Sequence, residues 1–266
     1  MLRGRVIPRP LSLLLHFAYQ EAASCLFPAF IFAMLVLSKV VEIPGLPRYD
    51  FMLLACVGMQ VAMVWWLRVE SVDELKVITL FHVLGTTMEV FKIAMGSWAY
   101  PDFAYSKLLG VPLYSGFMYA SVASYITQAW RRLELRLTNF PPSGLNVVLA
   151  ALIYLNFFTH HYTLDLRYVL ILAVFVAYWR TRVYFTVGGV SFWLPLKLGF
   201  ALVGFFIWLA ENIATYLGAW QYPDQATQWT LVHPGKFTSW FLLFIVSFLI
   251  VAQLKRVKAA RQGERW

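Results

Sequence analysis

The sequence has few charged residues and no nucleotide-binding motif. Only 13% of its 266 residues are charged, whereas 61% are hydrophobic and 18% aromatic. A soluble domain needs a larger charged surface, so this composition excludes one and indicates a multi-pass membrane protein. The chain also lacks a phosphate-binding Gly-rich loop, a Gly-x-Ser-x-Gly motif and a His-Glu-x-x-His motif. Soluble nucleotide and hydrolase chemistry are therefore not expected.

Cysteine is scarce as well, since only Cys25 and Cys56 are present and both lie in apolar segments. They predict free packing residues and no disulfide framework. The net charge is +9, but the basic residues stand between and after the apolar segments. That is the pattern of cytoplasmic loops, so the partner we expect is the lipid bilayer and not nucleic acid. We expect no cofactor, and the sequence leaves the oligomeric state open.

Eight stretches reach the length of roughly 20 apolar residues that a membrane-spanning helix needs. We expect spans at residues 19–41, 49–69, 74–98, 109–130, 143–162, 166–189, 194–219 and 234–254. The third should begin with a capping box of Ser71 and Glu74. The predicted fold is an all-α integral membrane protein with eight transmembrane helices. It consists of two parallel four-helix repeats, residues 1–138 and 139–266, in one membrane domain.

The basic residues also predict the orientation of the chain. Most of them fall on one side of an eight-span arrangement, namely Arg3, Arg5, Arg9, Arg68, Lys76, Arg131, Arg132, Arg136, Arg180, Arg182 and the C-terminal cluster. Because Lys and Arg concentrate in cytoplasmic loops, both termini should lie in the cytoplasm. With four spans per half, the halves share an orientation and should be related by a pseudo-twofold axis along the membrane normal.

One motif occurs twice. It runs from Glu89 to Asp102 and again from Glu211 to Asp224, with Glu, Gly, Trp, Tyr, Pro and Asp at the same spacing, 122 residues apart. Such distinctive residues at identical spacing indicate a gene duplication. Each copy places one carboxylate inside an apolar helix, where an ionisable side chain is costly and marks a functional site by default.

Small and polar residues share the helical face of each glutamate. Glu89 has Gly85 and Lys92 on its face, and Glu211 has Gly204. Glycines let a neighbouring helix approach, which shields the carboxylate from lipid. We interpret the two faces as a polar pocket in which Glu89 and Glu211 are catalytic and one acts as a general acid. The alternative is that each glutamate only holds helices together, Glu89 through Lys92.

Each copy of the motif ends in a Trp-x-Tyr-Pro-Asp loop. The residues that we expect to bind substrate or to surround the pocket mouth are Trp98, Tyr100, Asp102, Trp220, Tyr222 and Asp224, together with Lys92 and Asn212. The loops have a simpler interpretation too, because Trp and Tyr favour the membrane–water interface and Pro-Asp turns the chain.

A second polar cluster follows the fifth apolar segment and comprises His160, His161, Asp165 and Arg167. Two imidazoles and a carboxylate suit Zn²⁺, and His82 and His233 would complete a site. Adjacent histidines point in different directions on a helix, however, and no His-x-x-x-His pair is present. We therefore favour a polar turn at the membrane surface and predict no metal.

The second motif copy carries a family resemblance. It reads Ile207-Trp-Leu-Ala-Glu211-Asn-Ile-Ala-Thr-Tyr-Leu-Gly-Ala-Trp220-Gln-Tyr222-Pro-Asp224, followed by Val232-His233-x-Gly235-Lys236. With the His160-to-Arg167 cluster upstream, the sequence resembles an uncharacterised family of bacterial multi-pass membrane proteins over nearly its whole length. The resemblance implies a protein of the bacterial inner membrane and no established activity.

The first copy carries another resemblance. Glu89…Gly96-x-Trp98-x-Tyr100, followed by Gly110-Val-Pro112-Leu, is similar to the Glu…Gly-x-Phe-Gly-x-Tyr-x-Tyr…Gly-Val-Pro pattern of membrane carotenoid hydratases. Small-subunit lycopene cyclases, which differ from these hydratases, also use carboxylates embedded in the membrane. The second glycine and second tyrosine are missing here. The resemblance implies acid chemistry on an isoprenoid double bond, with Glu89 or Glu211 as the proton donor.

Three functions follow from these observations. The leading one is an intramembrane enzyme that uses buried glutamates on a lipid-soluble substrate, an isoprenoid or carotenoid whose carbocation aromatic rings would stabilise. Paired carboxylates and an internal repeat are also typical of a proton-coupled transporter. The third is a metal-dependent lipid hydrolase that uses His82, His160, Asp165 and His233.

Overall fold

The computed structural model describes residues 9–262, so Arg3 and Arg5 of the orientation argument lie outside the described residues. The helices are α1 (Arg9–Ser24), α2 (Leu26–Val40), α3 (Arg48–Val61), the π-helix η1 (Ala62–Trp66), α4 (Val72–Ala94), α5 (Ser115–Arg132), α6 (Ser143–Thr159), α7 (Arg167–Ala177), α8 (Leu196–Tyr216), the 3₁₀ turn η2 (Pro223–Gln225) and α9 (Lys236–Gln262). The strands are β1 (Lys107–Leu108), β2 (Val111–Pro112), β3 (Arg136–Thr138), β4 (Arg182–Val187) and β5 (Val190–Pro195).

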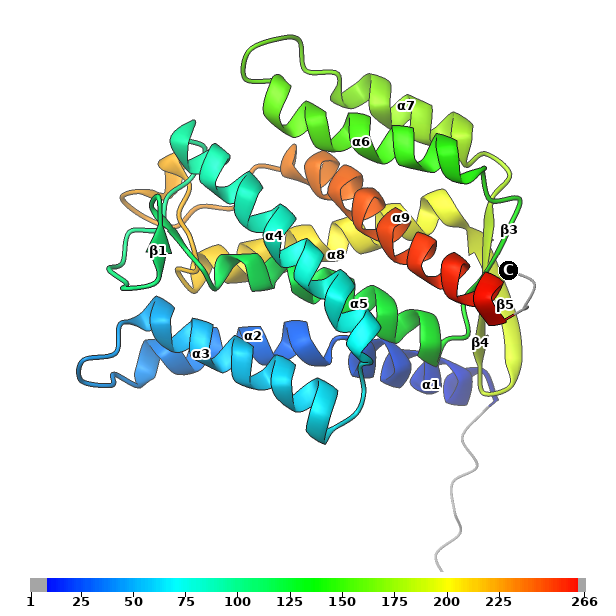
Figure 1. The fold of residues 1–266 in the computed structure, drawn as a ribbon, viewed down its shortest axis with the longest axis horizontal. Helices are drawn as coiled ribbons and strands as arrows, with labels where there is room; N and C mark the ends of the chain where they lie inside the picture. Colours follow the sequence, from blue (N-terminus) through cyan, green and yellow to red (C-terminus); the bar gives the residue numbers. More distant parts are fainter. Residues whose placement is uncertain (1–8, 263–266) are drawn as a thin grey trace, which may run out of the picture.

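The helices form an elongated bundle with α4, α5, α8 and α9 at its centre (Figure 1). On one side lie α1, α2 and α3, and on the other the hairpin of α6 and α7. The interior is mostly aliphatic and aromatic, and much of it comes from α5 and α9. The loops that follow α4 and α8 gather at one end of the bundle, with β1 and β2, while β3, β4 and β5 lie at the other.

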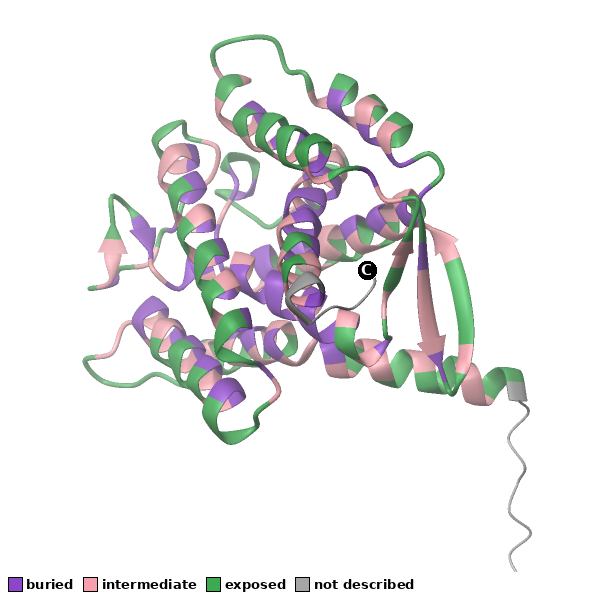
Figure 2. Cartoon of the chain, turned by 45° about the vertical axis from the view of Figure 1, so that its right-hand side comes forward, coloured by how far each residue is buried: buried purple, intermediate pink, exposed green. Residues whose placement is uncertain are grey.

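Several helices have the length and composition of membrane spans. Those that qualify singly are α4, α8, Lys236–Ala259 of α9, and α3 continued by η1, and the bent pair α1–α2 adds a fifth if it is one span. Exposed residues follow the outer faces of the helices (Figure 2), and many of them are large and apolar, as expected for a surface that lipid covers. The mainly helical fold predicted from the sequence is confirmed, with four helices in residues 9–262, or up to five, that are long and apolar enough to cross a membrane. Its eight spans and two repeats stay predictions.

Two expected helices differ most from the prediction, and the one expected over 109–130 begins only at Ser115, after β2. The first, over 19–41, is bent by 66° between α1 and α2 at Cys25. Pro28 explains the break, because proline lacks the N–H that would bond to the residue four positions earlier and its ring clashes there. It is tolerated because it lies in the first turn of α2.

The helix expected over 166–189 is the second difference, and it corrects the all-α prediction. Only α7 forms there, and β4 pairs with β5 as an antiparallel hairpin that β3 extends. Gly188 and Gly189 form the turn with φ of +55° and +77°, and Val187 pairs with Val190 across it. Two consecutive positive φ values are what a tight hairpin turn requires, and glycine supplies them without strain.

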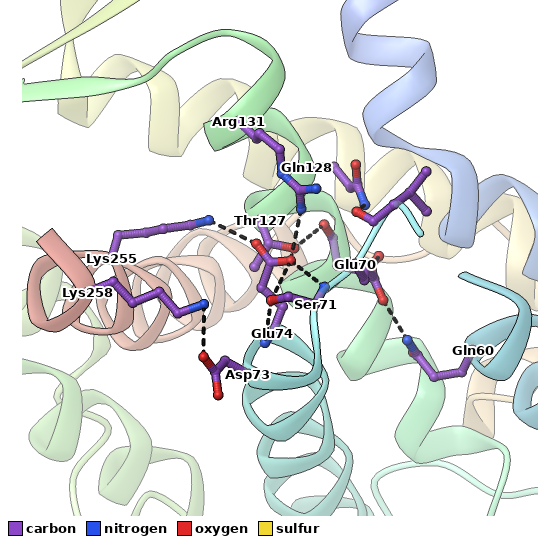
Figure 3. A network of polar contacts seen from close by, with 12 residues as sticks. Gln60, Glu70, Ser71, Asp73, Glu74, Thr127, Gln128, Arg131, Lys255 and Lys258 are labelled. Atoms are coloured by element: carbon purple, nitrogen blue, oxygen red, sulfur yellow. Dashed lines mark hydrogen bonds and ion pairs between the residues drawn. The ribbon is translucent and has the colours of Figure 1, made fainter. Parts of the chain in front are cut away.

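Ion pairs hold the sheet-side end of the bundle together (Figure 3). Glu74 forms the predicted capping box with Ser71. Its carboxylate also accepts hydrogen bonds from Arg131 of α5 at 2.9 Å and Lys255 of α9 at 3.0 Å. Beside it, the buried Glu70 carboxylate accepts from Gln60 at 2.6 Å and from Ser124. The network fixes the position of α4 relative to the central helices.

Candidate functional site

Glu89 lies in the last two turns of α4 and is 3% exposed. Its Oε2 accepts hydrogen bonds from Trp98 Nε1 at 2.7 Å and from the Tyr100 hydroxyl at 3.0 Å. The Tyr119 hydroxyl of α5 lies 2.6 Å from Oε1. All three partners are neutral, and within residues 9–262 no ion pair involves Glu89. The carboxyl group is thus held by aromatic donors alone.

Glu211 has a parallel environment in α8 and is also 3% exposed. Its Oε1 lies 2.6 Å from the Tyr222 hydroxyl, and its Oε2 accepts from Trp240 Nε1 of α9 at 2.7 Å. No ion pair to Glu211 occurs in the described part of the chain. Each glutamate therefore has one oxygen held by an indole and the other facing a phenol hydroxyl.

Both glutamates line the same cavity, which has a volume of about 50 Å³. Its remaining lining residues are almost all aromatic, namely Trp98, Met118, Tyr119, Trp220, Tyr222 and Trp240. A smaller, mostly apolar cavity of about 20 Å³ lies between α4, α5, α6 and α9, and Tyr119 lines both. The pocket thus combines two carboxyl groups with aromatic walls and has an apolar cavity beside it.

The repeated motif builds this pocket through the same local structure twice. Both α4 and α8 end in a glycine with positive φ, Gly96 at +69° and Gly218 at +70°. In both, the N–H groups of the glycine and the following residue bond back to the last turn of the helix, which is a Schellman motif. The chain then reverses, so that the tyrosine eleven residues after each glutamate contacts it.

The two loops also pair with each other. Ala99 and Gln221 exchange two backbone hydrogen bonds of 2.9 Å as an antiparallel bridge. The bridge lies between the tryptophan and the tyrosine of each copy, and Trp98, Trp220 and Tyr222 of the two loops line one cavity, whereas Tyr100 does not. Tyr114, which directly precedes α5, donates a hydrogen bond from its hydroxyl to the Ala219 carbonyl oxygen at 2.5 Å.

Glycines in the helices allow the partner helices to reach the glutamates. A Cβ on Gly85 would meet Tyr119 Cγ and Cδ2 at 2.5 Å, and one on Gly204 would meet the Phe241 backbone at 3.0 Å. The predicted close helix approach is therefore present at both positions. Because Gly85 has no side chain, Tyr119 can reach Glu89. Because Gly204 has none, the α9 segment that carries Trp240 can approach Glu211.

The other predicted site residues lie around this centre. Asp102 pairs with Arg48 at 3.3 Å and Asp224 is exposed, and neither lines the cavity. Asn212 bonds to the backbone of Trp208 and Val232, which ties α8 to the following loop.

One alternative predicted that Glu89 holds helices together through Lys92. In the structure Lys92 forms no ion pair with Glu89. Its Nζ lies 2.9 Å from His161 Nε2 and 3.3 Å from His160 Nε2.

The histidines do not form a metal site. The rings of His160 and His161 lie 4.2 Å apart. Among the described residues, however, no group of three or more His, Cys, Asp or Glu side chains is placed to hold a metal ion. The described residues thus provide no set of ligands for the hypothesis of a metal-dependent hydrolase.

Sequence reasoning missed Tyr119 and Trp240. They lie 30 and 29 residues after their glutamates, so the strict 122-residue offset pairs Tyr119 with Phe241 instead. A one-residue difference between the copies hid the correspondence. A search for aromatic residues near that offset would have found it.

Comparison with known proteins places the chain among relatives of undetermined role. A family model described as "Protein of unknown function (DUF817)" matches residues 13–248. The "Uncharacterized protein YoaT" of Bacillus subtilis (strain 168) is 56% identical over 252 residues, which is 94% of each chain. No solved structure matches. The bacterial family expected from the second motif copy is confirmed, and no activity comes with it.

Proposed function

Since this chain belongs to the DUF817 family of proteins of unknown function, we propose a function from the geometry of its own pocket: proton transfer by Glu89 and Glu211 to a lipid-soluble substrate. One observation carries the proposal. Two carboxyl groups, each 3% exposed, meet in one aromatic cavity with no ion pair to either among the described residues. Carboxyl groups in such surroundings are suited to general acid–base catalysis.

The hydrogen bonds indicate where the proton resides. An indole N–H can only donate, so the oxygens that bind Trp98 and Trp240 must accept. A phenol hydroxyl can donate or accept. A proton on either glutamate therefore belongs on Oε1, facing Tyr119 or Tyr222. The pocket accommodates both the acid and its conjugate base, as a proton-transfer site requires.

The proposed substrate is an isoprenoid or carotenoid. The aromatic faces of the cavity would stabilise a carbocation formed by protonation of a double bond. The cavity is too small for a whole polyene, so only the reacting end would enter it. The adjoining cavity of about 20 Å³, lined by Phe81, Leu84 and Met88 of α4, is smaller still and offers an apolar contact for only the next part of the chain.

Glu89→Gln and Glu211→Gln test the proposal. Lipid extracts of cells expressing each variant should lack a product that the wild-type protein forms, because glutamine keeps the shape but cannot carry the proton. Glu42→Gln, at an exposed site, is the control and should retain the product. Mass spectrometry of the extracts is the measurement. Unchanged product in both pocket variants would contradict acid catalysis by these residues.

A proton-coupled transporter is the second candidate, and Glu70 favours it. This carboxyl group is 3% exposed and lies near the opposite end of α4 from Glu89. Protonatable groups toward both sides of a membrane are what proton coupling needs. Reconstituted vesicles with a trapped pH dye would distinguish the candidates. Substrate-driven proton movement, lost in Glu70→Gln, would favour transport over catalysis.

The same proposal includes eight membrane crossings in the bacterial inner membrane, arranged as parallel repeats 1–138 and 139–266. The matching helix ends, glutamate–tyrosine bonds and loop pairing of the two halves support it. Both termini would then lie in the cytoplasm. A C-terminal green fluorescent protein fusion should fluoresce. Alkaline phosphatase activity at that terminus would overturn the orientation.

A further inference from the structure

Basic side chains from four segments gather beside the glutamate pocket. We call them the basic cluster: Lys92 of α4, His160 and His161 after α6, Arg167 at the start of α7, and Lys236 at the start of α9. Asp165 pairs with Arg167 at 3.1 Å. Lys236 and Arg167 both lie close enough to repel the Lys92 ammonium group electrostatically. The electrostatic repulsion of Lys92 by Lys236 and Arg167 is unfavourable, and Asp165 offsets it only in part.

Lys92 is a buried lysine whose ammonium group contacts two imidazoles and, among the described residues, no carboxylate. It is 6% exposed, and its ammonium group lies between the Nε2 atoms of His161 and His160 at 2.9 and 3.3 Å. His160 Nδ1 lies 2.7 Å from the Asn156 carbonyl oxygen. That oxygen can only accept, so Nδ1 carries the hydrogen and Nε2 presents a lone pair to Lys92. No ion pair to Lys92 occurs in residues 9–262.

Lys236 is the second lysine of the cluster, and Glu211 lies close enough to attract its ammonium group electrostatically. The Lys236 ammonium group lies over the rings of Tyr222 and Trp98, 4.5 and 5.3 Å from their centroids. These rings line the glutamate cavity. Lys236 likewise forms no ion pair within the described range of the chain. The lysine therefore connects the basic cluster with the pocket.

The α4 side chains of the basic cluster and the two cavities become less polar from Lys92 back to Phe81. Lys92 lies in the last turn, Glu89 one turn earlier, and Met88 and Phe81 line the apolar cavity. At a rise of 1.5 Å per residue, the distance from Lys92 to Phe81 is about 16 Å. The order is cationic, then acidic and aromatic, then apolar. It matches an amphiphile with an anionic head and a hydrocarbon chain.

We propose that the basic cluster binds the phosphate group of the substrate, which is an isoprenoid phosphate whose first double bond lies between Glu89 and Glu211. A phosphate monoester carries a charge of about −1.5 to −2 near neutral pH, which the two lysines would balance. This inference rests on the proposed function and narrows its substrate class. A bound phosphate would also offset the repulsion of Lys92 by Lys236 and Arg167.

The test measures binding to the purified full-length protein in detergent, by native mass spectrometry. The probes are farnesyl phosphate, farnesol and inorganic phosphate. Farnesyl phosphate should bind at least about tenfold more tightly than either other probe, since both the charge and the chain contribute. Equal affinity for farnesol would overturn the phosphate site. Equal affinity for inorganic phosphate would overturn the assignment to a lipid.

Variants assign the binding to residues. Lys92→Met and Lys236→Met should each weaken farnesyl phosphate binding by about tenfold or more, and Lys92→Arg should retain it. Lys76→Met is the control, because Lys76 is exposed and pairs with Asp73 near the far end of α4. Gel filtration confirms that each variant is folded. Unchanged binding in both methionine variants would overturn the inference.

The glutamate variants separate this inference from the proposed function. Glu89→Gln and Glu211→Gln should still bind farnesyl phosphate, because neither belongs to the basic cluster, while they lose turnover. Binding that depends on the lysines, together with turnover that survives in both glutamine variants, would support the phosphate site and contradict acid catalysis. If turnover needs the glutamates but the protein binds farnesyl phosphate no more tightly than farnesol, acid catalysis is supported and the phosphate site is contradicted.

Discussion

The pocket glutamates are held by two kinds of side chain, which differ in whether they can only donate a hydrogen bond or can also accept one. Trp98 and Trp240 hold one oxygen of each carboxyl group as an acceptor. Tyr119 and Tyr222 face the other oxygen and can follow a change of protonation by turning their hydroxyl groups. The indoles thus fix the position of each carboxyl group, and the phenols leave its protonation variable.

Tyr222→Phe tests this view of the glutamate environment. The substitution removes the 2.6 Å contact to Glu211 and leaves a buried carboxyl oxygen without its partner, which costs about 1–3 kcal/mol. We expect a lower midpoint of thermal unfolding in detergent. Tyr216→Phe is the matched control on α8, because Tyr216 is 67% exposed. Equal midpoints for the two variants would show that the hydroxyl bond is not significant.

At the scale of elements, the contact between α4 and α5 determines whether Tyr119 reaches Glu89. Gly85 lies where a methyl group would overlap with the Tyr119 ring and its Cβ, at 2.5 to 2.7 Å. The Cβ cannot move without its backbone, so the helices themselves must separate. The glycine therefore serves the site by bringing two helices close together.

Gly85→Ala should lower the stability of the protein by about 1–3 kcal/mol through overpacking. It should also lengthen the bond between Tyr119 and Glu89. Gly58→Ala is the control, because Gly58 is exposed on α3 with nothing within 4 Å of an added Cβ. Alanine there should be neutral or stabilising by about 0.5–1 kcal/mol. Thermal unfolding in detergent measures both, and equal shifts would contradict the close packing.

The hairpin of β4 and β5 shows how an element can be misjudged. Residues 182–195 are apolar enough to extend a predicted span, and hydropathy alone favours a helix. The stretch is nevertheless rich in Val, Phe and Trp on either side of Gly188-Gly189, which is a hairpin signal. The strand-forming residues and the turn outweighed the overall apolarity.

Over the whole molecule, carboxyl groups lie toward both ends of the central helices. Glu89 and Glu211 line the pocket at one end, and Glu70 and Glu74 belong to the network at the other. Glu74 is paired with Arg131 and Lys255, whereas Glu70 forms no ion pair among the described residues and accepts hydrogen bonds from neutral side chains, Gln60 and Ser124 among them. Burial therefore raises the pKa of Glu70 above its ordinary 4.5, with the charge of Glu74 as a smaller contribution.

This shift predicts how stability depends on pH. A carboxyl group with a raised pKa in the folded state binds its proton more tightly than in the unfolded state. Its contribution to stability is complete below pH 4.5 and is lost as the pH rises through the folded-state pKa. Glu70→Gln removes that loss. The stability of the variant relative to wild type should therefore increase with pH from about 4.5 upward.

Thermal unfolding in detergent at a series of pH values is the measurement. A difference in midpoint between Glu70→Gln and wild type that does not change with pH would show that Glu70 titrates normally. Because Glu70 lies between η1 and α4 and bonds to α3 and α5, the effect would report on several elements at once.

The sequence by itself determined the class of molecule and one side of the pocket. Long apolar segments require a membrane because their exposed surface would be unfavourable in water, and the repeated Glu-to-Tyr spacing with its glycine specifies a local turn that returns each tyrosine to its glutamate. These features depend on residues close together in the chain, so a pattern can show them.

The tertiary structure alone decided the rest of the site. Tyr119, Trp240 and the meeting of Lys92 with His160 and His161 join residues 29 to 69 positions apart. Such contacts depend on which helices pack together, how closely glycines let them approach and how the helices are rotated. No spacing along the chain encodes those quantities, because they result from the packing of many side chains at once.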